Sequence, residues 1–88
     1  MSVFDNKKEK TITFKVAKDE ENRVGRTLTA VYNALMEKGY NPLNQLVGYI
    51  LTEDPTYITN HNNARTFITQ IERDEILRHL LKSYLKID

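Results

Sequence analysis

The chain has 88 residues, with 13 basic and 12 acidic side chains and a net charge of +1. This balance argues against binding to nucleic acid or to an anionic membrane through bulk charge. The absence of cysteine excludes disulfides, thiolate chemistry and metal sites with cysteine ligands. No segment has the length and hydropathy of a signal peptide or a membrane span, so we expect one cytosolic (cytoplasmic) domain without membrane insertion.

The N-terminal part of the chain differs in pattern from the rest. Residues 1–10 are polar and charged, and we expect them to be flexible. In residues 11–16 apolar and polar side chains alternate, which is typical of a strand. No second strand is evident, so this segment would pair with its copy in another chain or lie extended on helices. We therefore expect a flexible arm over residues 1–18 and a helical dimerisation domain over residues 19–88.

The first predicted helix runs from Asp19 or Asn22 to Lys38. Gly39 ends it, because glycine readily adopts the left-handed backbone conformation. Gly25 weakens its first turns by about 1 kcal/mol relative to alanine. Its apolar residues share one face: Val24, Leu28, Val31, Tyr32 and Leu35.

The second predicted helix runs from Pro42 to about Thr52, with Asn41 as its N-cap. Its apolar residues recur at i, i+3, i+4, i+7 and i+8, which predicts one buried face on which neighbouring elements pack. The residues of this face are Leu43, Leu46, Val47, Ile50 and Leu51. Gly48, near the middle, indicates either a close crossing by another element or a tolerated cost.

The second half of the chain predicts a single helical turn and two further helices. Asp54 can cap a turn that begins at Pro55, and residues 59–63 form a polar connection. The apolar pattern that begins at Ala64 resumes out of phase after Asp74, so we expect a break at residues 72–74 with Asp74 as a candidate N-cap. The predicted fold class is all-α, a compact bundle of four helices plus one short helical turn.

The helices carry more apolar and aromatic side chains than one small core plainly uses. We therefore expect a homodimer, and tyrosine side chains suit the centre of its interface. The predicted interface residues are Tyr32, Tyr40, Leu46, Tyr49, Ile50 and Tyr84. The alternative is that the tyrosines cover the rim of the core within one chain.

The sequence predicts a non-enzymatic protein with no metal and no cofactor. His61 lies in an amide-rich loop, and His79 follows Glu75 by four residues, an ordinary pair on a helix surface. Glu72, Asp74 and Glu75 share one predicted helix start, where capping explains them better than acid–base catalysis. Neither a glycine-rich phosphate loop nor a nucleophile beside a base is evident.

Nucleic-acid binding is the alternative function. Short helices around a polar turn can form a helix-turn-helix, in which Asn60, Asn62, Asn63 and Arg65 could read bases. Phosphate contacts supply most of the affinity for DNA and require a basic stripe, and the helical part of the sequence has none.

The residues from Thr29 to Leu51 resemble a small family of Gram-positive bacterial proteins typified by the regulatory phosphoprotein IreB. The similarity includes Lys-Gly-Tyr-Asn-Pro, Asn-Gln and Val-Gly-Tyr, and it continues in residues 54–58, 64–65, 72–76 and 82–85. It implies an all-helical homodimer without enzymatic activity. It also implies phosphorylation of N-terminal threonines by a transmembrane serine/threonine kinase with PASTA domains, and a phosphatase that reverses it. The implied role is in cell-envelope stress responses and in the regulation of cephalosporin resistance.

The resemblance also indicates a phosphorylation site. The family's Thr-x-x-Phe falls on Thr11 to Phe14, which makes Thr11 the matched phosphoacceptor and Thr13 an additional candidate. The family's other threonine, three positions earlier, is Lys8 here. The alternative is that both threonines are surface positions of a short strand. We expect the partners to be a second copy, the kinase, the phosphatase and a downstream protein that the sequence does not identify.

Phosphorylation of Thr11 would change the charge of a lysine-rich arm from basic to nearly neutral. One hypothesis is that this change cancels a contact between the basic arm and an acidic partner surface. The competing hypothesis is that the phosphate binds to helix starts of the dimer itself.

Overall fold

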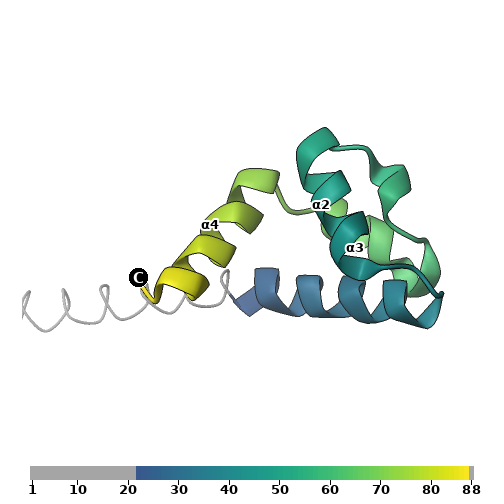
Figure 1. Ribbon diagram of the computed structural model, residues 1–88, viewed down its shortest axis with the longest axis horizontal. Helices are drawn as coiled ribbons and strands as arrows, with labels where there is room; N and C mark the ends of the chain where they lie inside the picture. Colours follow the sequence, from purple (N-terminus) through teal and green to yellow (C-terminus); the bar gives the residue numbers. More distant parts are fainter. Residues whose placement is uncertain (1–21, 88) are drawn as a thin grey trace, which may run out of the picture.

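The structure is a computed structural model that describes residues 22–87. Every regular element in that range is helical (Figure 1). The N-terminal helix is described from residue 22 to residue 37, and the elements after it are α2 (Pro42–Thr52), η1 (Pro55–Tyr57), η2 (His61–Asn63), α3 (Ala64–Thr69) and α4 (Arg73–Leu85). The predicted all-α class with four helices is confirmed for the described part of the chain. The predicted arm, its strand over residues 11–16 and the start of the first helix lie outside the described residues.

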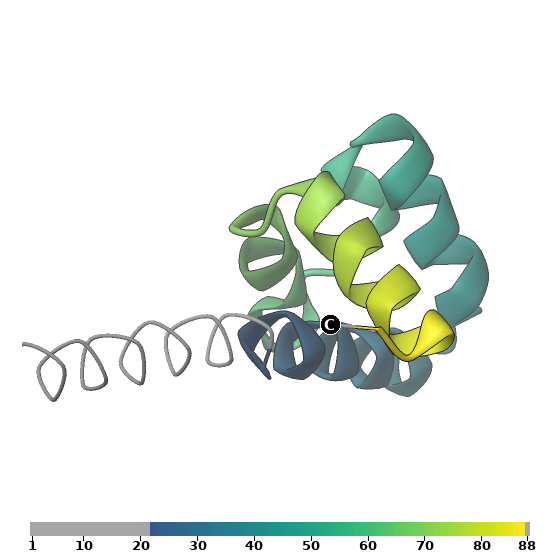
Figure 2. The same ribbon diagram turned by 90° about the vertical axis from the view of Figure 1, so that its left-hand side faces the viewer.

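The helices pack around the N-terminal helix. In Figure 1, α2, η1 and α3 gather over its second half, whereas α4 slopes back toward its start. In Figure 2 the last turn of α4 lies over the later part of the N-terminal helix, so α4 crosses that helix obliquely. One core joins these elements, and its buried residues are Val24, Val31, Ala34, Leu35, Tyr49, Ile58, Ala64, Ile68, Ile71 and Ile76.

The predicted helix ends are confirmed by their hydrogen bonds. Gly39 has φ +84°, the Gly39 N–H donates to Met36 O, and the Tyr40 N–H donates to Leu35 O, which together form a Schellman motif. At the start of α2, Asn41 Oδ1 accepts from the Asn44 N–H at 3.1 Å. The left-handed turn and the following N-cap therefore fix the angle between the first two helices.

The predicted N-cap of the last helix is wrong by two residues. Glu72 is the N-cap of α4, and its N–H donates to the carboxylate of Glu75 at 3.2 Å. Asp74 instead lies in the first turn of α4, where its negative charge interacts favourably with the helix dipole. The helix starts earlier because two acidic side chains inside its first turn stabilise that turn, whereas a cap at Asp74 would leave Arg73 outside the helix.

Gly48, near the middle of α2, lies where another element packs closely on the helix. A Cβ atom at this position would lie 2.6 Å from Tyr57 Cδ1 and 2.9 Å from Tyr57 Cζ. The aromatic ring of Tyr57, in η1, therefore packs directly on the backbone of α2 at Gly48. Gln45 fixes the same turn, because its side-chain amide donates to Tyr57 O at 2.9 Å. Gly48 thus marks a close approach, which justifies its cost in helix propensity.

Replacing Gly48 with alanine tests this packing. We expect Gly48→Ala to lower the free energy of unfolding by about 1–2 kcal/mol, because overpacking outweighs a gain of about 1 kcal/mol in helix propensity. In a Tyr57→Ala background the same substitution should raise stability by up to about 1 kcal/mol, since the ring is gone. Urea unfolding followed by circular dichroism measures both changes.

Gly25→Ala is the matched control for this substitution. A Cβ atom at Gly25 would lie 3.5 Å from His79 Nε2, which is an ordinary contact, so we expect no loss of stability. A destabilisation by Gly48→Ala that persists without the Tyr57 ring would contradict the proposed contact.

Candidate interaction surface

Helix α2 divides its apolar residues between two faces. Leu46, Tyr49 and Ile50 pack in or against the core. Leu43 and Leu51 are 68% and 74% exposed, and Val47, midway between them, is also exposed. The predicted single buried face is therefore wrong in three of its five members. The apolar pattern of α2 is wider than one buried stripe, and the side of the helix that carries Tyr49 faces the core.

Helix α4 has more exposed large apolar residues than any other described element. Ile76 is its one buried residue. The other large apolar residues of its sequence are exposed, and Tyr84 reaches 84%. They are spaced by three or four positions along the helix, so they form a continuous stripe. The exposed residues of this segment are Leu77, Leu80, Leu81, Tyr84, Leu85 and Ile87.

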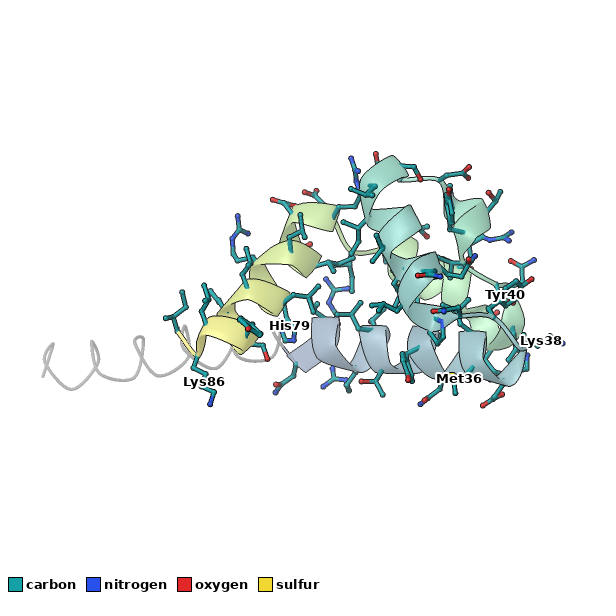
Figure 3. The ribbon with its side chains drawn as sticks, in the orientation of Figure 1. Met36, Lys38, Tyr40, His79 and Lys86 are labelled. Carbon is teal, nitrogen blue, oxygen red and sulfur yellow. The ribbon has the colours of Figure 1, made fainter. Side chains whose placement is uncertain are left out.

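The residues predicted for a dimer interface lie at different depths. Tyr49 is 3% exposed and belongs to the core of its own chain, so it has almost no surface left for a partner. Leu46 and Ile50 are partly buried against the core. Tyr32 and Tyr40 are about half exposed, and Figure 3 shows Tyr40 near Lys38, at the end of the N-terminal helix. Only Tyr84 belongs to the exposed stripe of α4.

Sequence reasoning missed the two outward stripes, on α2 and on α4, that together hold eight of the 14 exposed large apolar residues within the described range. The signal was present, because each helix has more apolar residues than one face holds. A helical pattern alone does not show which side of such a helix faces its own core. The outward stripe of α2 consists of Leu43, Val47 and Leu51, and that of α4 of Leu77, Leu80, Leu81, Tyr84 and Leu85.

Arg73 holds the end of α2 against the start of α4. Its Nη1 donates to Ile50 O at 2.8 Å, and its Nη2 lies 3.2 Å from Glu53 Oε1. Burial raises the pKa of the neighbouring Tyr49 phenol, and the carboxylate of Glu53 adds to this rise while the Arg73 guanidinium opposes it. A cation at the C-terminal end of a helix also interacts favourably with the helix dipole.

The arginines considered for nucleic-acid binding are used within the fold. Arg65 Nε donates to Ile58 O at 2.8 Å and so fixes the chain between η1 and α3. Arg73 is occupied by Ile50 and Glu53. Neither guanidinium therefore supports the predicted alternative of a nucleic-acid binder.

Several of the titratable groups weighed for catalysis have structural roles. His61 Nε2 lies 2.7 Å from Glu37 Oε1, which ties the loop before α3 to the N-terminal helix. Glu75 caps the start of α4. Within residues 22–87 no three histidine or acidic side chains come together as metal ligands would, and none of the described helices is long and apolar enough to cross a membrane.

The turn after α2 contains one perturbed carboxylate. Asp54 Oδ1 accepts from the Thr56 N–H at 3.0 Å and from the Thr56 hydroxyl at 2.8 Å. These two hydrogen bonds lower the pKa of the Asp54 carboxyl. The contribution of ionised Asp54 to stability is thus present above its unfolded pKa and is lost as the pH falls through its folded pKa.

We expect Arg73→Met to lower the free energy of unfolding by about 1–2 kcal/mol, because Ile50 O and Glu53 lose a charged donor that is only partly exposed. Arg78→Met is the matched control, since Arg78 Nη2 lies 3.8 Å from Asp74 Oδ2 on the surface of the same helix. Its loss should stay within about 0.5 kcal/mol. Urea unfolding at fixed protein concentration gives both values, and equal losses would contradict a special role for Arg73.

The predicted phosphorylation sites, Thr11 and Thr13, lie outside the described residues. The comparison with protein families nevertheless reaches this part of the sequence. The model of the IreB regulatory phosphoprotein family matches residues 9–86, which is nearly the whole chain. The match includes both threonines and both exposed apolar stripes. The chain therefore belongs to the family of IreB regulatory phosphoproteins.

Proposed function

We propose that this protein is a non-enzymatic phosphoprotein that regulates other proteins by binding them. The family supports a regulatory role. Of the side chains that were weighed for catalysis, His61 pairs with Glu37, and Glu72 and Glu75 cap the start of α4, while several helices expose apolar faces. These faces are the observation that carries the proposal, because extended apolar surface on a small domain marks a site of protein–protein contact.

The first partner in this proposal is a second copy of the chain. The apolar stripe of α4 projects from a helix that buries only Ile76, and a helix with so little burial gains stability from a second contact surface. A two-fold dimer would use the same surface on both copies. We propose that Leu77, Leu81 and Tyr84 lie at its centre, with the outward stripe of α2 as the second exposed apolar surface that a copy can cover.

The second part of the proposal is the modification of the N-terminal segment. The family match begins at residue 9 and so includes Thr11 and Thr13. We propose that a cytoplasmic serine/threonine kinase domain of the PASTA-containing type phosphorylates Thr11, and that a phosphatase reverses this step. The signal would act on cell-envelope stress and cephalosporin resistance through a downstream protein partner.

Phosphopeptide mass spectrometry on protein isolated from its native host tests the modification. We expect phosphate on Thr11, because Thr11 has the Phe14 spacing of the family motif. Thr11→Ala should remove most of the phosphopeptide signal, whereas the matched Thr13→Ala should leave most of it. Modification confined to Thr13, or to residues after 22, would contradict the assignment.

Sedimentation equilibrium of the full chain tests the dimer. We expect Leu81→Glu to raise the dissociation constant by about 100-fold, because it places a charge in an apolar interface, and each tenfold change is about 1.4 kcal/mol. Ser83→Glu is the matched control, since it adds the same charge to an exposed polar position of the same helix. Equal effects of both substitutions, or a wild-type monomer of 10.3 kDa at micromolar concentration, would contradict this interface.

A further inference from the structure

Positive charge is concentrated at one end of the described fold. The segments 22–36 and 76–87 contain five basic and no acidic side chains, whereas residues 37–75 contain six acidic and three basic ones. Both segments lie toward the same end of the long axis in Figure 1, where α4 slopes back toward the start of the N-terminal helix. The basic residues of this end are Arg23, Arg26, Arg78, Lys82 and Lys86.

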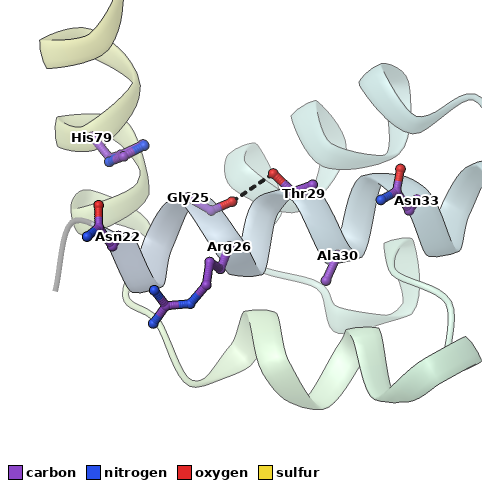
Figure 4. A pocket seen from close by; sticks show the side chains of 7 residues that line it. All are labelled: Asn22, Gly25, Arg26, Thr29, Ala30, Asn33 and His79. Atoms are coloured by element: carbon purple, nitrogen blue, oxygen red, sulfur yellow. Dashed lines mark hydrogen bonds between the residues drawn. The ribbon is translucent and has the colours of Figure 1, made fainter. Parts of the chain in front are cut away.

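A groove of about 620 Å³ lies at this end, along the N-terminal helix and beside α4. Figure 4 shows the His79 ring of α4 beside the first turns of the N-terminal helix, with Asn22 and Arg26 at the same end of that helix. The ring packs at Gly25, where an added Cβ atom would lie 3.5 Å from His79 Nε2. Asn33 lies further along the groove. Within residues 22–87 no carboxylate lines it, and the polar side chains that line it are mostly hydrogen-bond donors or can act as donors.

The two cationic or potentially cationic groups of the groove are not used by the described fold. Among residues 22–87, neither Arg26 nor His79 has a hydrogen-bond or ion-pair partner. Arg65 and Arg73, by contrast, donate to backbone carbonyls, and Arg78 pairs with Asp74. In Figure 4 the His79 ring and the Arg26 side chain lie on opposite sides of the N-terminal helix, so they border the groove from two sides. A phosphomonoester offers a double negative charge and several acceptor oxygens, which suits hydrogen-bond donors on two sides.

We propose that this groove binds a phosphomonoester, and that its ligand is the phosphothreonine of an N-terminal segment. This inference rests on the proposed phosphorylation of Thr11. Thr11 precedes Asn22 by eleven residues, so an extended chain can reach up to about 36–40 Å from it. The groove from Asn22 to Asn33 is only about 17 Å long on a helix. The phosphate can therefore come from the same chain or from a second copy.

The charge of the segment makes this binding depend on phosphorylation. The lysines around Thr11, such as Lys8 and Lys10, carry the same charge as Arg26, so the unmodified segment has no favourable charge contact with that guanidinium. Phosphate adds a charge of about −1.5 to −2 and reverses the local interaction at Thr11. The modification would thus move the segment onto the fold instead of only weakening a contact elsewhere.

A synthetic peptide of residues 7–16 with phosphothreonine at position 11, titrated into the full chain, tests the groove. NMR resonances of the His79 ring and the Arg26 side chain should shift and saturate, and the unphosphorylated peptide should leave them unchanged. Arg26→Gln should weaken binding at least tenfold. Arg23→Gln is the matched control, because Arg23 lies on the same helix but does not line the groove, and it should change binding less than threefold.

The groove is not the binding site if the phosphopeptide leaves the His79 and Arg26 resonances unchanged, or if Arg23→Gln and Arg26→Gln weaken binding equally. A third contradicting result is binding that occurs only after Asp19, Glu20 and Glu21 are changed to amides. The last result would mean that acidic residues of the chain already occupy it. Because the peptide is synthetic, these results do not depend on the kinase. If Thr11 is phosphorylated in the host but the phosphopeptide does not shift the His79 and Arg26 resonances, only the groove as a binding site is refuted. If the phosphopeptide shifts these resonances but Thr11 carries no phosphate in the host, only the origin of the ligand is refuted.

The source of the phosphate is decided with the full chain phosphorylated at Thr11 by semisynthesis. Binding within one chain should shift the His79 resonance equally at all protein concentrations. Binding to a second copy should make the shift grow with concentration, in step with dimer formation. A phosphorylated chain whose His79 resonance does not shift at any concentration contradicts both forms of the proposal.

Discussion

The main constraint on this fold is that the chain buries only a small part of helix α4. Helix α4 places one residue, Ile76, in the core, and the apolar residues that follow it lie at the surface. A short helix without such packing is only marginally stable in water. A cap at Glu72 and the arginine link to α2 hold its first turn, whereas Leu77, Leu80 and Leu81 after Ile76 are exposed. A second contact surface for α4 is therefore the condition on which the proposed role depends.

Polar contacts rather than a large core set the positions of the other elements. Arg65 and Arg73 each donate to a backbone carbonyl that a helix or turn leaves without a partner. His61 and Gln45 make similar links from loop to helix and from helix to turn. These bonds fix α2, η1 and α3 over the N-terminal helix. Apolar side chains that a larger protein would bury in its core remain exposed and can contact a partner. This arrangement suits a protein that acts by binding other proteins.

The sequence was sufficient where one residue type decides the local structure. Gly39 ended the first helix because its backbone conformation excludes most other residues, and Asn41 and Asp54 were placed correctly as caps. It was not sufficient where several residues compete for the same role. Glu72 and Asp74 are both able to cap α4, and the surrounding turn decides between them. Asn62 and Asn63 adopt left-handed conformations in η2, a 3-10 turn inside a segment that was expected only to be a polar connection.

The sequence indicated that apolar side chains would be left for an interface, but it did not indicate which residues would be exposed. The excess of apolar residues indicated an interface, yet Tyr49 went to the core while Leu43 and Leu51 stayed outside. The Gly48 contact explains part of this outcome, since Tyr57 packs on one side of α2 and thereby helps to fix its rotation. Such a contact joins residues nine positions apart through a turn, and no helical pattern encodes it.

Hydrogen exchange of the full chain at several protein concentrations tests this central claim most directly. If α4 needs a second copy, the amides of residues 77–85 should exchange quickly in dilute protein and become protected as the concentration rises, whereas the amides around Leu35 should be protected throughout. Equal protection of residues 77–85 at every concentration, in a chain that sediments as a monomer, would contradict it.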